Sequence, residues 1–163
     1  MSLKLGPASK EALDSLLDQG FTYAPQQSAF PLMPKELTNL DSEELSALFS
    51  QLTAWSNYVA TQLSAAQIDE RAADRALETA SAKLMVNRMT QKITGERITG
   101  IKAEVSIDPK ILKLTEDLDK VYAYRKMIES MFYNLERDTA LVSRELTRRA
   151  SDFRANRKDK YSS

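Results

Sequence analysis

A pair of glycines in the middle of the chain is set among four cations, three of them in the stretch QKITGERITGIK at residues 91–102 and one, Arg88, just before it. The motif Ile-Thr-Gly occurs twice there and ends at Gly95 and at Gly100. Glycines let a phosphate chain approach the backbone closely, and cations neutralise its charge. The cations that could make such contacts are Arg88, Lys92, Arg97 and Lys102. The stretch therefore predicts a nucleic-acid contact, while a flexible turn with a solvated surface remains the alternative interpretation.

A second group of cations lies near the C-terminus, where residues 144–163 contain seven Lys or Arg against three Asp or Glu. Phe153 and Tyr161 are interleaved with them. This combination suits single-stranded nucleic acid, because aromatic rings stack on bases while cations meet phosphates. The residues expected to bind here are Arg154, Arg157 and Lys158. The preceding Arg144, Arg148 and Arg149 favour a solvated helix end, where cations complement the helix dipole.

The chain has few residues suited to catalysis, because it contains no histidine and no cysteine. The commonest general base, the commonest metal ligand and the thiolate nucleophile are therefore missing. No phosphate-binding loop, nucleophile elbow, zinc spacing or dinucleotide fingerprint occurs. The carboxylates of Glu70, Asp74 and Glu78 recur at intervals of four, where like charges on a helix repel. We expect a protein that is not an enzyme, with no cofactor and no metal.

The two long runs on either side of the central stretch predict the elements that would position these cations. The first run, residues 42–94, has neither glycine nor proline and opens on a capping box formed by Asp41 and Glu44. Leu40 and Leu45 stand where a hydrophobic staple needs them. A helical stripe follows at Leu48, Leu52, Trp55, Val59, Leu63, Ala66, Ala73, Leu77, Ala80 and Leu84, with Glu70 filling one position. A helix of roughly 50 residues is too long for a compact monomeric globule.

The second run also predicts a long helix, with Asp108 as its cap and Pro109 at its first position. An unbroken three-four alternation, typical of coiled coils, follows it. Its members are Ile111, Leu114, Leu118, Val121, Arg125, Ile128, Phe132, Leu135, Thr139, Val142 and Leu146. The polar members Arg125 and Thr139 could fix the register or the number of partners. A side row from Tyr122 to Tyr133 widens the apolar face, which implies more than one helical neighbour.

These patterns predict an all-α fold, a long antiparallel two-helix hairpin of coiled-coil type that self-associates. The glycines are expected to break the helix at a tip over residues 91–108, whose β-branched residues could pair as a short β-ribbon or stay mobile. The expected oligomer or partner interface consists of Phe30, Leu32, Ile111, Leu114, Leu118, Val121, Ile128, Phe132 and Leu135. We divide the chain into an arm (1–40), the hairpin (41–155) and a basic tail (156–163).

The arm contains four of the five prolines and carries three Lys or Arg against seven Asp or Glu when counted to residue 47. A short helix is expected from Ser9 to about Gln19, ended by Gly20 and burying Leu13, Leu16 and Leu17. The segment FTYAPQQSAFPLMP then reads as extended chain that lies against its own helices or a partner.

The whole chain is 28% charged with a mean hydropathy of −0.43, and no apolar run is long enough to span a membrane.

The segment VSIDPKILKLTEDLDKVYAYRKMIESMFYNL resembles the second conserved block of phage recombination mediators of the UvsY type. The matching positions are Ser106, Asp108, Ile111, Leu112, Lys113, Leu114, Leu118 and Tyr122. The upstream WSNYVATQLSAAQIDERAADRALE resembles the first helix of that family, and a glycine-containing charged loop lies between the blocks there as well. The resemblance covers about residues 45–149, so the arm and the tail depart from it.

The resemblance implies a small non-enzymatic phage protein that forms rings or bundles and binds single-stranded DNA. Such proteins help to load a RecA-type recombinase onto DNA covered by single-strand-binding protein. The DNA contacts would fall on Arg88, Lys92, Arg97 and Lys102, and the protein would act in the cytoplasm of the host cell. Two alternatives remain open from the pattern. One is a phage structural or assembly protein of the virion that docks through its arm, and the other is a prefoldin-like chaperone with a client groove at the helix tips.

Overall fold

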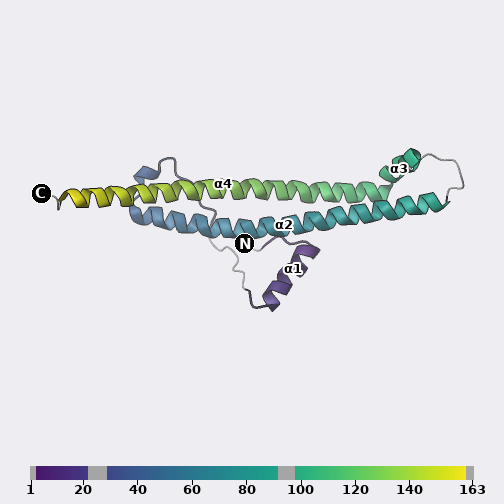
Figure 1. The fold of residues 1–163 in the computed structure, drawn as a ribbon, viewed down its shortest axis with the longest axis horizontal. Coiled ribbons are helices and arrows are strands. Elements are labelled where there is room, and N and C mark those ends of the chain that lie inside the picture. Colours follow the sequence, from purple (N-terminus) through teal and green to yellow (C-terminus); the bar gives the residue numbers. More distant parts are fainter. Residues whose placement is uncertain (1–2, 22–28, 92–97, 161–163) are drawn as a thin grey trace. The chain divides into compact units, whose positions relative to one another are not determined.

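The computed structural model describes residues 3–21, 29–91 and 98–160, and within them the side chains of all but Gln91 and residues 154–160. Its elements are α1 (Pro7–Asp18), the 3-10 helix η1 (Leu37–Asn39), α2 (Ser42–Gln91), α3 (Ile98–Ser106) and α4 (Pro109–Lys160) (Figure 1). No strand occurs in the described part of the chain. The two long helices α2 and α4 pack together, which confirms the predicted all-α helical hairpin. None of the described helices is both long and apolar enough to cross a membrane.

Two compact units make up the chain. Unit 1 contains residues 1–3, 24–62 and 128–163, and unit 2 contains residues 4–23 and 63–127. The first part of α2 pairs with the second part of α4 in unit 1, and the remaining parts pair in unit 2. Each unit therefore contains residues of the arm as well as residues of the hairpin.

The core of unit 1 is built from the seam predicted for the two long helices. It contains Leu45, Leu52, Trp55 and Val59 of α2 with Leu135 and Val142 of α4, all at most 5% exposed. The capping box that starts α2 is present, because Asp41 Oδ1 accepts hydrogen bonds from the backbone N–H groups of Glu43 and Glu44, both 2.8 Å. The backbone N–H of Asp41 donates in return to Glu44 Oε2 at 2.9 Å. Here local capping and apolar periodicity together decide where the helix begins.

The arm folds back onto the core of its own unit. The indole Nε1 of Trp55 donates a hydrogen bond to the carbonyl of Ala29 at 3.0 Å, and the ring of Phe30 lies edge-on, 5.1 Å from that of Trp55. Met33, Leu37 and Leu40 also pack against this core. Of the two arm residues expected at an interface, Phe30 therefore lies on its own chain, whereas Leu32 is 85% exposed.

The tip of the hairpin, which belongs to unit 2, differs from the sequence prediction, because residues 98–106 form the helix α3. Ile101 and Val105 stand one helical turn apart and are buried with Ile111, against partly buried Leu77 and Leu84 of α2. Burial of this apolar pair outweighs the β-propensity of its members, so neither a β-ribbon nor a mobile turn forms there. The prediction that Gly100 breaks the helix was wrong, since it lies inside α3. Gly95 lies outside the described residues.

The seam of α4 is the face that the sequence predicted. Every member from Ile111 to Leu146 is buried or half-buried, and Asp108 caps the helix by accepting a hydrogen bond from the Lys110 N–H at 2.9 Å. The side chains of Ile111 and Leu135 are 6% and 1% exposed within the single chain. The seam is thus already occupied by intramolecular packing, and the predicted contact with further copies stays a prediction.

The short arm helix α1 ends as expected but packs less than expected. The N–H groups of Gly20 and Phe21 bond to the carbonyls of Leu17 and Leu16, and Gly20 has a φ of 89°, which is a Schellman C-cap. Leu16 and Leu17 are each 46% exposed. The prediction that they are buried was therefore wrong, because α1 is held to the hairpin by polar contacts at its N-terminal end.

Candidate nucleic-acid interface

Two of the four central cations lie on described residues near the tip. Arg88 is half-exposed near the end of α2, and Lys102 is exposed on α3, directly after the buried Ile101. Because Ile101 and Val105 fix α3 against α2, Lys102 has a defined position instead of lying on a free loop. Within the described residues, no carboxylate is within ion-pair distance of Arg88 or Lys102. The other two cations, Lys92 and Arg97, lie outside the described residues.

Apolar side chains are exposed close to these cations in the sequence. Met89 is 42% exposed, Ile98 is 58% exposed and Ile107 is 70% exposed. Gly100 also faces open space, because a Cβ built there would meet no atom within 4 Å. There is therefore open space beside the backbone in the first turn of α3, and the phosphate contact inferred from the sequence stays a prediction.

Among the C-terminal cations, Arg144 is exposed, Arg148 and Arg149 are ion-paired, and the side chains after residue 153 are not described. Glu145 accepts hydrogen bonds from Arg148 Nη2 at 2.8 Å and from Arg149 Nε at 2.9 Å, and Arg148 Nη1 pairs with Asp152 at 2.8 Å. The hydrogen bonds from Arg148 and then Arg149 lower the pKa of Glu145 from 4.5 to about 2. The charges of these two arginines are thus engaged within α4. The side chains of Arg154, Arg157 and Lys158 lie outside the described residues.

Phe153 precedes that group and is 69% exposed. An exposed ring beside a basic segment is the arrangement expected of a stacking surface for bases.

Arg149 has a second role, since its Nη2 donates to the carbonyl of Leu37 at 3.1 Å and so holds the arm on α4.

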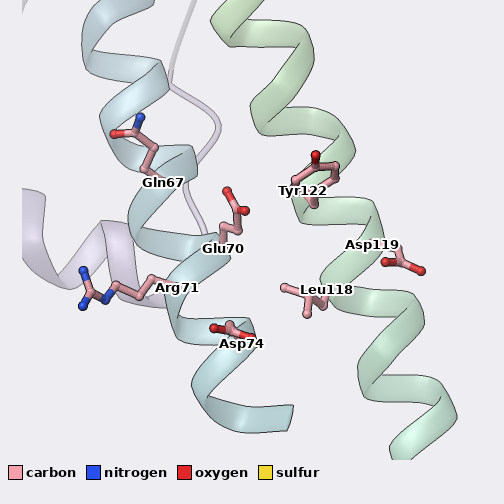
Figure 2. Close-up of a pocket in the computed structure, with 7 residues that line it drawn as sticks. All are labelled: Gln67, Glu70, Arg71, Asp74, Leu118, Asp119 and Tyr122. Atoms are coloured by element: carbon pink, nitrogen blue, oxygen red, sulfur yellow. The ribbon is translucent and has the colours of Figure 1, made fainter. Parts of the chain in front are cut away.

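A polar groove in unit 2 was not anticipated from the sequence (Figure 2). It encloses 630 Å³ between α2 and α4 and is lined by Gln67, Glu70, Arg71, Asp74, Leu118, Asp119 and Tyr122. Glu70 points toward α4, where it pairs with Arg125. In the described part of the chain, no three acidic side chains converge as a metal ion would require.

A second unanticipated feature is the attachment of the arm at Asp69 of α2. The carboxylate accepts hydrogen bonds from Gly6 N at 2.8 Å, Ser9 N at 3.0 Å and Ser9 Oγ at 2.7 Å. It thereby caps the N-terminus of α1 from another helix. A Cβ at Gly6 would lie 2.6 Å from Asp69 Cγ, so any other residue there would displace the carboxylate. Asp69 lies 63 residues from Gly6, and no local pattern could have indicated the contact.

In comparisons with known proteins, no family model, no curated protein and no solved structure matches the chain.

Proposed function

We propose that the protein is a non-enzymatic phage recombination mediator that binds single-stranded DNA through the tip of its hairpin and helps to load a RecA-type recombinase. The observation that carries the proposal is the helix α3 in the described part of the tip, which carries the exposed Lys102 and a Gly100 that faces open space. The sequence resemblance from Ser106 to Tyr122 supports the same function. A recombinase and a single-strand-binding protein are the partners that this function requires.

The physical basis of the proposed contact is phosphate neutralisation. Each cation that displaces a counterion from single-stranded DNA contributes about 0.7 to the slope of log affinity against log salt concentration. Arg88 and Lys102 have no carboxylate in ion-pair distance among the described residues, so their charge does not need to be released from an ion pair before binding. The exposed Ile98 and Ile107 supply apolar surface for unstacked bases.

The test is fluorescence anisotropy of a labelled single-stranded oligonucleotide at several salt concentrations, with duplex DNA in parallel. We expect tighter binding to the single strand and affinity that falls with salt. The double variant Arg88→Gln and Lys102→Gln should bind more weakly and with a shallower salt slope. Arg75→Gln removes an exposed cation from α2 outside the tip and is the matched control. No binding at low salt, or equal losses in variant and control, would reject the tip as the DNA site.

The arm supports a second candidate, a phage structural or assembly protein. Leu32 is 85% exposed although the neighbouring Pro31 is buried, so the arm presents an apolar side chain to solvent. In this function Leu32 would dock on a neighbouring subunit. Leu32→Ser would then reduce the oligomeric state measured by light scattering, whereas a DNA-binding role of the tip predicts no effect of that substitution on oligonucleotide affinity.

A further inference from the structure

An apolar pocket of 460 Å³ lies in unit 2 where the arm crosses the hairpin. Its walls include Leu5 of the arm, the small residues Ala66, Ala72 and Ala73 of α2, and Val121 and Tyr124 of α4. The alanines leave room beneath the arm that no side chain of unit 2 fills. The volume is within the range of roughly 300–1,000 Å³ that is usual for small-molecule sites.

The shape of this pocket is fixed by the hydrogen bonds of Asp69. Three donors from Gly6 and Ser9 converge on its carboxylate, and Ser9 is 2% exposed. The arm wall is therefore held in place before any ligand arrives, which lowers the cost of ordering on binding. Asp69 also lines the pocket, but these three hydrogen bonds already compensate its negative charge.

Two ammonium groups border the apolar walls. The Nζ of Lys4 lies 4.2 Å from the ring centroid of Tyr124, and Lys120 lines the pocket from α4. Lys120 pairs with Glu116 at 2.7 Å, but both side chains are about two-thirds exposed at 64% and 67%. Exposed pairs of this kind contribute little, so a ligand anion can replace Glu116 as the partner of Lys120.

We propose that this pocket binds a small organic anion with an apolar body. The anionic group would lie at Lys4 and Lys120, and the body would contact Val121 and Tyr124. The three lining side chains that are charged at neutral pH are two cations and the hydrogen-bonded Asp69, so an anion complements them better than a cation. The site is separate from the proposed DNA contact and does not depend on it.

The test compares octanoate with 1-octanol, which has the same chain length but no charge, by isothermal titration calorimetry of the full chain. We expect octanoate to bind about tenfold more tightly than 1-octanol, since only its carboxylate can form a charge-assisted contact with Lys4 and Lys120. Lys120→Gln should remove most of that preference. Glu116→Gln should instead raise the affinity for octanoate several-fold, because it removes the nearer of the two carboxylates that pair with Lys120, at 2.7 Å against 3.7 Å for Asp117. Lys113→Gln, an exposed cation of α4 that does not line the pocket, is the matched control.

Steric blocking provides an independent check. Ala73→Leu places a larger side chain in the pocket wall and should abolish binding of both ligands, with circular dichroism used to verify that the helices are retained. Equal affinity for octanoate and octanol, an unchanged affinity in Glu116→Gln, or no heat of binding for either ligand would overturn the proposal. The exposed substitutions Lys120→Gln and Glu116→Gln leave the core untouched, so their affinities decide the question even where Ala73→Leu does not fold.

Discussion

Arg125 of α4 and Glu70 of α2 form a two-point ion pair, with 2.6 Å between Nε and Oε2 and 3.2 Å between Nη2 and Oε1. Their side chains are 13% and 23% exposed, at positions where the seam is otherwise largely apolar. The guanidinium also lies 5.1 Å from the ring centroid of Tyr122. A partly buried pair of this geometry opposes slippage of one helix along the other, because any other register would leave a charge without its partner.

Removal of one member of this pair should cost more than removal of both. We expect Arg125→Leu and Glu70→Leu each to lower the free energy of unfolding by about 2 kcal/mol, since each leaves the other charge partly buried. The double variant should be more stable than either single variant, so its loss should lie well below the sum of the single losses. Urea unfolding of all four proteins measures the coupling, and purely additive losses would contradict a specific pair.

The arm should detach locally when Asp69 loses its carboxylate. Asp69→Ala removes the acceptor of three hydrogen bonds and the cap of α1, whose loss is usually worth about 1 kcal/mol. Hydrogen exchange should accelerate over residues 3–19 while the cores of both units keep their protection. Gly6→Ala should act in the same direction because its Cβ would collide with Asp69. Asp74→Ala, an exposed carboxylate on the same helix, is the control.

Gly100→Ala should have opposite effects on stability and on binding. Alanine fits the helical backbone of α3 without steric conflict, so α3 should gain about 0.5–1 kcal/mol and exchange its amides more slowly. The added methyl group would keep a phosphate farther from the backbone, so oligonucleotide affinity should fall a few-fold. A variant that is more stable and binds DNA as tightly as the parent would exclude Gly100 from the contact.

Acid should weaken the attachment between Glu145, Arg149 and the arm. The folded-state pKa of Glu145 is lowered from 4.5 to about 2, so its contribution to stability is fully present above pH 4.5 and is lost as the pH falls toward 2. Glu145→Gln should therefore be less stable than the parent near neutral pH, with a difference that shrinks through this window. Urea midpoints across that pH range give the comparison, and a constant difference would show that the carboxylate charge is not responsible.

Periodicity and capping made the two long helices predictable from the sequence. The helix starts are marked by local signals, which are Asp41 with Glu44 and Asp108 with Pro109. The seam residues can be recognised from the spacing within a single helix. The pairing of Arg125 with Glu70 was not predictable, because the pattern places both on seams without giving the register between antiparallel helices. The helix α3 was missed since Ile101 and Val105 favour strands until α2 buries them. The bonds of Asp69 to Gly6 and Ser9 depend on the tertiary fold alone.

Trp55 is the only tryptophan in the chain, and its indole N–H is bonded to the arm at Ala29 while its ring contacts Phe30. At 5% exposure it has a largely dry environment, to which the arm contributes one side and the core of α2 and α4 the rest. Departure of the arm would admit water to the indole and shift its emission to longer wavelength. The protein thus carries its own optical reporter, and the attachment of the arm can be followed in solution without a dye, in real time and at low concentration.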